Sequence, residues 1–128
     1  MPAEGQGRAR AQLSVVAEDP VAGWAPAHRL EQDAALLGRL LTAAAGHRHS
    51  GGQRPDVSVD DVAAGLSLFG EMRVTLDRLE TQVVIEARRR GMDWRRIAEY
   101  QGLNSSQAAS QRYQRLVTRL EEIRQGVR

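Results

Sequence analysis

The 128-residue sequence contains no cysteine and no lysine, and only 4% of its residues are aromatic. Without cysteine, disulfide bonds, thiolate metal sites and cysteine nucleophiles are excluded. No apolar stretch approaches the roughly 20 residues that a membrane helix needs, and residues 1–12 lack the apolar centre of a signal peptide. We therefore expect a protein that is neither secreted nor membrane-spanning, with the cytoplasm as its location.

The sequence also lacks the patterns of common catalytic and cofactor sites. It has no nucleophile–base pattern, no glycine-rich phosphate loop and no pair of carboxylates suited to acid–base chemistry. Its histidines, His28, His47 and His49, have no cysteine or ordered carboxylate pattern nearby, so they predict no metal site. We expect no enzyme activity, no cofactor and no small-molecule ligand.

The basic residues are all arginine, 18 in number, and they gather toward the C-terminus. From Glu86 to the end there are ten arginines and five acidic residues, whereas residues 1–85 hold eight arginines and eleven acidic residues. A basic C-terminal third suits a polyanionic partner such as nucleic acid, and the plainer alternative is a solvated charged face.

Three regions are predicted along the chain. Residues 1–26 mix glycine, proline, alanine and charges without a sustained period, which is typical of a disordered arm. Trp24 is the exception, and we expect it to dock the end of the arm onto the helices. Residues 27–91 form a two-helix support or dimerisation region, and residues 92–128 form a helix-turn-helix. The expected fold class is all-α, a helical hairpin or long-helix support followed by a C-terminal helix-turn-helix.

The first helix of the support is predicted between Pro26 and Gly46, from His28 to Ala45, and residues 47–56 read as a flexible connection. Its apolar residues recur at steps of three and four, which places them on one face. They are Leu30, Ala34, Leu37, Leu41 and Ala44.

The second helix is predicted to be long. Ser58 and Asp61 form a capping pair at its start, and three arginines followed by Gly91 close it. A stripe of apolar residues holds for about three heptads. It consists of Val62, Phe69, Leu76 and Val83, with Met72 and Leu79 interleaved. The stripe predicts either packing against the first helix or a helix-to-helix dimer seam, and we expect a homodimer.

A short helix and a longer one follow. Asp93 caps the short helix and Gly102 ends it, with Leu103 filling the space between the two helices. Asn104 and Gln107 are predicted to form the next capping pair. The last helix is expected from Ser105 or Ser106 to Gln125.

This pattern fits a helix-turn-helix, because steeply crossing helices need a small residue inside the first helix and a glycine at the turn. Ala98 and Gly102 stand at these places. In the last helix, Ala109 begins an apolar series at helical spacing, whereas Ala108 begins a polar one. We therefore expect Ala109 to face the core and a polar, uncharged set to face outward and read bases. That set is Ser106, Gln107, Ser110, Gln111 and Gln114.

Residues around the motif are suited to the phosphate backbone, which arginine, small polar side chains and helix N-termini contact. The candidates are Arg88, Arg89, Arg90, Arg95, Arg96, Asn104, Ser105, Arg112 and Arg115. Arg88 to Arg90 have an equally good alternative as charges at a helix C-terminus. Trp94 and Tyr113 fall on inward faces, so we expect them in the core rather than stacked on bases.

Residues 90–113, which contain Trp94, Ile97-Ala98, Gly102, Gln107-Ala-Ala109 and Arg112-Tyr113, resemble the helix-turn-helix of small actinobacterial DNA-binding proteins. They are also similar, more weakly, to region 4 of bacterial sigma factors. Gln101 departs from the usual leucine before the glycine. The resemblance implies binding to double-stranded DNA, as a transcriptional regulator or nucleoid-associated protein. The alternative is a protein-interaction module in which the long helix binds a partner and the helix-turn-helix is only structural.

Overall fold

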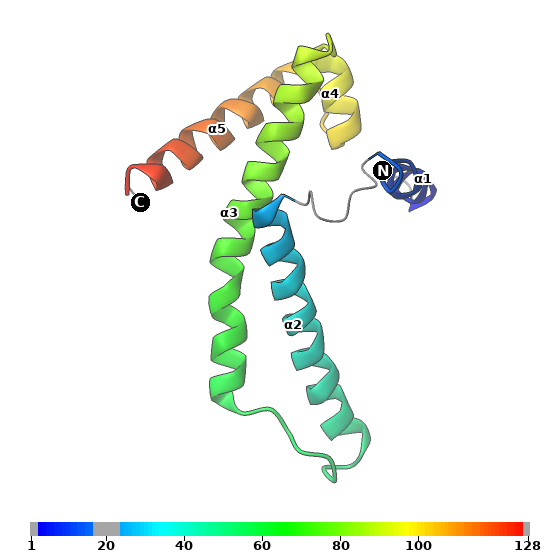
Figure 1. The fold of residues 1–128 in the computed structure, drawn as a ribbon, viewed down its shortest axis with the longest axis vertical. Helices are drawn as coiled ribbons and strands as arrows, with labels where there is room; N and C mark the ends of the chain where they lie inside the picture. The colour runs from blue at the N-terminus through cyan, green and yellow to red at the C-terminus, as the bar shows by residue number, and fades with distance from the viewer. Residues whose placement is uncertain (1–2, 17–23, 127–128) are drawn as a thin grey trace. The chain divides into compact units, whose positions relative to one another are not determined.

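A computed structural model describes residues 3–16 and 24–126 of the chain (Figure 1). The described residues form α-helices and contain no strand, which confirms the all-α fold class. The helices are α1 (Ala3–Leu13), α2 (Ala25–His49), α3 (Val59–Arg89), α4 (Trp94–Gln101) and α5 (Ser106–Arg124). Beyond α1, they belong to two compact units. Residues 24–76 form the hairpin unit and residues 77–126 form the C-terminal unit.

The disordered arm expected at the N-terminus is not confirmed, because Ala3–Leu13 form α1. Alanine, glutamine and arginine, which favour helices by propensity alone, supply most of this segment. Its apolar residues form only a weak amphipathic pattern, so apolar periodicity does not predict this helix. Trp24 is the N-cap residue of α2 and is half exposed, and Pro26 follows in the first turn.

In the hairpin unit, α2 and the first part of α3 run side by side (Figure 1). Gly65 of α3 is buried, and a Cβ atom there would meet Leu40 at 2.8 Å and Leu37 at 3.3 Å. An ion pair of 3.4 Å joins Arg29 to Glu71 across the same pair of helices. The glycine therefore makes the space that the α2 leucines fill.

The predicted inner face of α2 was wrong in part. Leu41 is 68% exposed and Ala34 is also exposed, whereas Leu40 takes the inner position. Leu30, Leu37 and Ala44 are partly buried as predicted, and the error at Leu41 arises because α2 turns its Leu37–Leu40 edge toward Gly65 of α3. The helix also begins before His28 and continues past Ala45 to His49.

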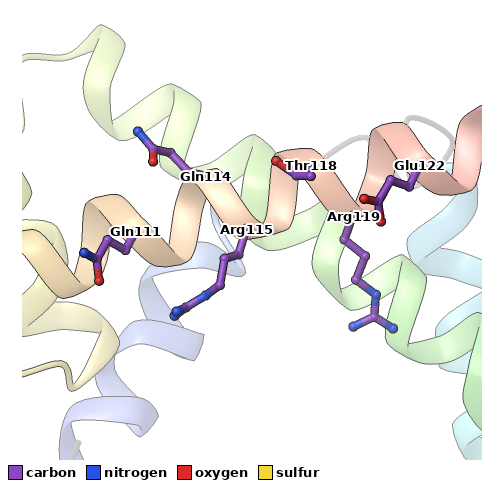
Figure 2. Close-up of a pocket in the computed structure, with 6 residues that line it drawn as sticks. All are labelled: Gln111, Gln114, Arg115, Thr118, Arg119 and Glu122. Atoms are coloured by element: carbon purple, nitrogen blue, oxygen red, sulfur yellow. The ribbon is translucent and has the colours of Figure 1, made fainter. Parts of the chain in front are cut away.

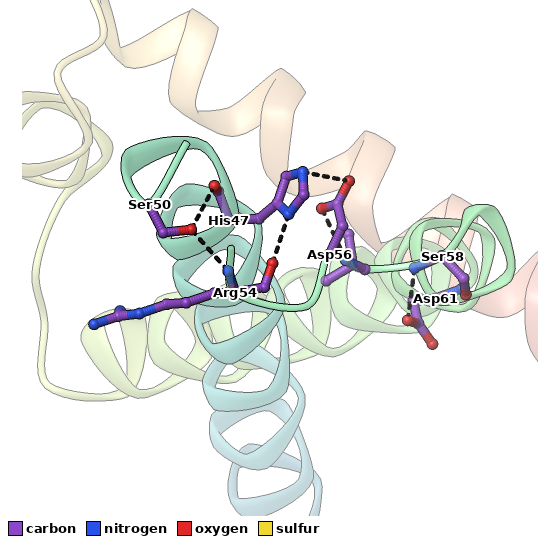
Figure 3. A network of polar contacts seen from close by, with 7 residues as sticks. His47, Ser50, Arg54, Asp56, Ser58 and Asp61 are labelled. Carbon is purple, nitrogen blue, oxygen red and sulfur yellow. Dashed lines mark hydrogen bonds and ion pairs between the residues drawn. The ribbon is translucent and has the colours of Figure 1, made fainter. Parts of the chain in front are cut away.

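The connection between α2 and α3 is hydrogen-bonded, where the sequence predicted a flexible segment (Figure 3). Ser50 Oγ donates to the His47 carbonyl and accepts from the Arg54 N–H, both at 2.9 Å. The His47 ring bonds the Arg54 carbonyl oxygen at 2.7 Å, and because a carbonyl only accepts, Nδ1 donates. His47 Nε2 lies 3.7 Å from the Asp56 carboxylate. These side chains close the turn before α3 begins.

The predicted capping pair at the start of α3 is confirmed. The Asp61 N–H donates to Ser58 Oγ at 3.0 Å, and the Ser58 N–H donates to the Asp61 carboxylate at 2.9 Å. This reciprocal pair satisfies donors that the first turn of a helix leaves free.

The apolar stripe of α3 divides into two parts. Met72 and Leu79 are partly buried. The other series is exposed, and its members are Val62, Phe69, Leu76 and Val83. The stripe was predicted either to pack against the first helix or to form a dimer seam. Packing within the chain partly buries the Met72–Leu79 series and leaves the other series exposed.

The C-terminal unit is built around a small core. Val84 of α3, Ile97 and Ala98 of α4 and Ala109 of α5 are buried, each at 4% exposure or less. Partly buried side chains surround them, namely Ala87, Met92, Trp94, Leu103 and Tyr113. The Trp94 and Tyr113 rings lie 5.7 Å apart between centroids, so both contribute to packing as the sequence predicted.

Two glycines end the helices of this unit in the same way. Gly91 and Gly102 have φ of 81° and 74°, a left-handed conformation that glycine adopts without strain. After Gly91, the Met92 N–H donates to the Ala87 carbonyl at 3.0 Å, and after Gly102, the Leu103 N–H donates to Ala98 at 2.8 Å. Both are Schellman ends, which satisfy carbonyls at the helix terminus. The short α4 is thus closed at Gly102, as predicted.

The boundary between the units lies inside α3, at Asp77, rather than near residue 91. The end of α3 belongs with α4 and α5 because Val84 and Ala87 supply one wall of their core. None of the helices in the described ranges combines the length and the apolarity needed to cross a bilayer.

Candidate nucleic-acid interface

The N-terminus of α5 sets the register of the candidate site. Ser105 caps the helix, its Oγ accepting the Ala108 N–H at 3.1 Å. The predicted capping pair of Asn104 and Gln107 was wrong by one position, because Ser105 has the extended backbone of an N-cap residue and a serine oxygen in reach of the third N–H. Ala109 is 1% exposed, so it faces the core as predicted.

Because Ala109 and Leu116 face inward, the opposite face of α5 is open. Gln107, Gln111 and Gln114 are exposed there. Ser106 is exposed in the first turn of α5, and Ser110 is partly buried. All five predicted base-reading side chains are uncharged groups that both donate and accept hydrogen bonds. The structure brings the three glutamines to one open surface and leaves Ser106 and Ser110 toward its edge.

This surface continues toward the C-terminus of α5. In Figure 2, Gln111, Arg115 and Arg119 extend from successive turns toward the same side, and Thr118 lies between them along the helix. A shallow depression there is lined by Gln111, Gln114, Arg115, Thr118, Arg119 and Glu122. Thr118 was missed in the sequence, although it stands four residues after Gln114 and so shares its face.

Three predicted phosphate-binding arginines are free to meet a ligand. Arg95 and Arg96 are exposed in the first turn of α4, and Arg115 is exposed on α5 beside the glutamines. Within residues 24–126, none of these three forms an ion pair. Their charge is therefore available to an anion on the α4–α5 side of the unit.

Asn104 and Ser105 lie in the turn between α4 and α5, where both are exposed. Ser105 Oγ accepts the hydrogen bond of the Ala108 N–H, so this side chain caps the N-terminus of α5. The first-turn N–H groups of α5 remain at an exposed helix N-terminus, which favours negative charge.

Three other arginines are held at the end of α3. The Arg88 guanidinium lies 5.0 Å from the Trp94 ring centroid, and its Nη1 donates to the Met92 carbonyl at 3.2 Å. Arg89 and Arg90 both pair with Glu86. The Arg90 hydrogen bond is the main cause that lowers the pKa of Glu86. These contacts match the alternative prediction, in which Arg88 to Arg90 serve the helix end.

Arg112 binds another helix instead of facing outward. Its Nη2 and Nε donate to the two carboxylate oxygens of Glu80 on α3, at 2.7 and 2.5 Å. Gln101 of α4 donates to the same carboxylate at 2.9 Å. The Arg112 hydrogen bond is the largest cause that lowers the pKa of Glu80, against burial, which raises it. Glu80 in turn raises the pKa of Arg112.

The Glu80 network gives Gln101 a place in the packing of α4 against α3. A leucine would leave Glu80 with one donor fewer in a partly buried place. A second link, 3.4 Å between Arg119 and the Asp77 carboxylate, also joins α5 to α3. Glu80 and Asp77 were not singled out in the sequence, because their partners stand 32 and 42 residues further along the chain.

Comparison with protein-family models, with curated proteins and with solved structures found no match for this chain. In the described part of the chain, no group of three or more histidines and carboxylates gathers as a metal site. The open polar face of α5 and the arginines beside it form the candidate site.

Proposed function

We propose that α4 and α5 form a helix-turn-helix that binds double-stranded DNA, with the N-terminal half of α5 in the major groove. The observation that carries the proposal is the N-terminal half of the α5 face opposite buried Ala109, where Gln107, Gln111 and Gln114 are exposed. The carboxylate that lines the depression on this face, Glu122, lies about two turns beyond Gln114. A face that meets only water favours charged residues, whereas base edges require groups that donate and accept.

In this proposal the side chains divide by role. Glutamine pairs with adenine through two hydrogen bonds, so Gln107 and Gln111 read bases, with Ser106, Ser110 and Gln114 beside them. Arg95, Arg96 and Arg115 contact phosphates, since they are exposed and unpaired within residues 24–126. Asn104 and the N-terminus of α5 add a phosphate contact at the turn.

For four of the arginines predicted to contact phosphates, we propose instead that they stabilise the C-terminal unit. Arg88, Arg89, Arg90 and Arg112 already bind groups of their own unit. Arg112 is the strongest case, because releasing it to a phosphate would leave the partly buried Glu80 carboxylate without its main partner.

The resemblance of residues 90–113 to actinobacterial helix-turn-helix proteins supports the same proposal. A transcriptional regulator and a nucleoid-associated protein are its two forms. They differ in the ratio of specific to random-sequence affinity, which is large for the first and small for the second.

The test is fluorescence anisotropy of a labelled random 30-base-pair duplex with the full chain. Three phosphate contacts per copy predict a loss of affinity of about 40-fold between 50 and 200 mM salt. Arg95→Ala and Arg115→Ala should each reduce the slope of log affinity against log salt by about one. The matched control is Arg124→Ala, because Arg124 is paired with Glu121 at the far end of α5. Salt-independent binding, or no binding at 50 mM salt, would overturn the proposal.

Base reading has its own test, with genomic fragments selected for tight binding. Gln107→Ala and Gln111→Ala should each cost about 1–3 kcal/mol of discrimination on a selected site, with little change on random DNA. If the two variants weaken binding to both kinds of DNA equally, the glutamines do not read bases. In the rival function, a protein-interaction module, all these variants leave binding to the partner unchanged.

A further inference from the structure

One face of α3 in the hairpin unit is apolar and uncovered. Its members repeat at heptad spacing and are Val59, Val62, Leu66, Phe69, Arg73 and Leu76, which we call the α3 seam. The five apolar members are between 37% and 85% exposed. Apart from Arg73 this face is apolar, and exposed apolar patches on a protein surface mark interaction sites.

We propose that the α3 seam pairs with the α3 seam of a second copy of this chain, in antiparallel orientation. The steps between its members are three, four, three, four and three, the same sequence from either end. A homodimer with twofold symmetry needs a self-complementary surface, and this spacing supplies one. A twofold axis between Ser67 and Leu68 places Leu66 opposite Phe69 of the second copy and Val59 opposite Leu76.

Arg73 decides the orientation. In a parallel pair the two Arg73 side chains would meet in one layer, with like charges in contact. In the antiparallel register Arg73 lies opposite Val62 of the second copy, and the two Arg73 residues are 11 positions apart, about 16 Å along the axis. That separation exceeds the Debye length of about 8–10 Å at physiological salt.

The Arg73 side chain is already placed for this role. Its guanidinium lies 5.6 Å from the centroid of the Phe69 ring of its own chain. The charge is therefore held against a seam residue, and in the proposed dimer the aliphatic stem of Arg73 covers Val62 of the second copy.

Small residues flank the seam on one side. Gly70 stands in the middle of α3, and no atom beyond its own stretch of helix lies within 4 Å of the place where its Cβ would be. A glycine inside a helix weakens it, and nothing in the hairpin unit requires one at this position. Ala63, one heptad earlier, is also exposed. Together they allow a second helix axis to come near, since interaxial distance depends on the side chains at the contact.

The first experiment is sedimentation equilibrium of the full chain from 1 to 100 μM. The expected result is a dimer that Leu66→Arg converts to a monomer, with at least a tenfold rise in the dissociation constant. Ser67→Arg is the matched control, because it adds the same charge one residue further on, on another exposed face of α3, and should leave the dimer intact. Circular dichroism should show unchanged helix content, since Leu66 is 68% exposed, and Leu76→Arg should reproduce the result.

The second experiment fixes orientation. The chain has no cysteine, so a spin label on Asp60→Cys marks one site per copy. In the antiparallel register Asp60 lies at the level of residue 75 of the second copy, so the two labelled positions are about 22 Å apart along the axis, whereas in a parallel pair they lie at one level.

The inference would be overturned if the wild-type chain is a monomer at 100 μM, which would leave the α3 seam to a different protein. It would also be overturned if the dimer persists in the Leu66→Arg variant, or if the two spin labels lie at the same level along the helix axis. None of these experiments contains DNA, so their outcome is independent of the proposed function.

Discussion

The Arg112 guanidinium on α5 binds both carboxylate oxygens of Glu80 on α3. Such two-point pairs fix geometry as well as charge, because the planar fork matches a carboxylate. The pair, with Gln101 of α4 as a third member, holds the three helices of the C-terminal unit in one arrangement. The outward angle of the α5 glutamines is set by this contact as well as by buried Ala109.

Glu80 makes the stability of the C-terminal unit depend on pH. Its pKa in the folded protein is lowered, first by the Arg112 hydrogen bond. A lowered folded pKa adds stability that is present above the unfolded value of about 4.3 and is lost as pH falls through the folded pKa. At pH 7, Glu80→Gln should therefore cost about 1 kcal/mol, since the pair is only partly buried.

Urea unfolding of wild type and Glu80→Gln between pH 7 and pH 3 measures this. The difference in unfolding free energy should shrink below about pH 4.3 and vanish in acid. A difference that stays constant over this range would show that Glu80 is not held ionised by Arg112.

Arg112 and Arg115 stand one turn apart on α5 and should behave in opposite ways. Arg112→Gln should lower the free energy of unfolding by about 1 kcal/mol and leave the salt dependence of DNA binding unchanged. Arg115→Gln should leave stability unchanged within about 0.5 kcal/mol and reduce the salt slope by about one. Thermal melting and anisotropy titrations on both variants check this, and exchanged phenotypes would contradict the assignment.

Much of the local structure could be predicted because neighbouring residues decide it. Two helix caps join residues only three positions apart, Ser58 with Asp61 and Asp93 with the Arg96 N–H. Gly102 ends α4 because its own backbone adopts the left-handed conformation. The inward position of Ala109 followed from helical spacing in the same way.

What could not be predicted depends on distant partners. Leu40 rather than Leu41 faces α3 because Gly65 opens a space there, and neither helix shows this alone. Glu80 links α3 to α5 because it binds Arg112, which stands 32 residues further along the chain. Thus the polar face of α5 could be predicted from the sequence, whereas the contact of Arg112 with Glu80 required the fold.

The register of α5 has a direct test in its two alanines. Ala109 is 1% exposed and belongs to the core, whereas Ala108 is only partly buried. Ala109→Gln should cost about 3 kcal/mol or more, because it overfills the core and buries an amide, and Ala108→Gln should cost about 1 kcal/mol or less. Chemical denaturation ranks the two, and the reverse order would move the proposed DNA-reading face to other residues.

Two glycines should respond oppositely to the same substitution. Gly38 lies inside α2 with no heavy atom within 4 Å of a Cβ, so Gly38→Ala should stabilise the hairpin unit by about 0.5–1 kcal/mol. Gly102 has φ of 74°, so Gly102→Ala should cost about 1 kcal/mol. Urea midpoints of the two variants decide this. Equal shifts of the same sign would contradict the helix end described at Gly102.

The most direct test of DNA binding through α5 is a titration of ¹⁵N-labelled protein with a selected DNA duplex, followed by NMR. The account predicts that the side-chain amide signals of Gln107, Gln111 and Gln114, with the backbone signals of Ser106 and Arg115, shift most. Signals of α2 should remain in place. Perturbation confined to α2 and the first part of α3, with the glutamine amides unmoved by saturating DNA, would contradict it.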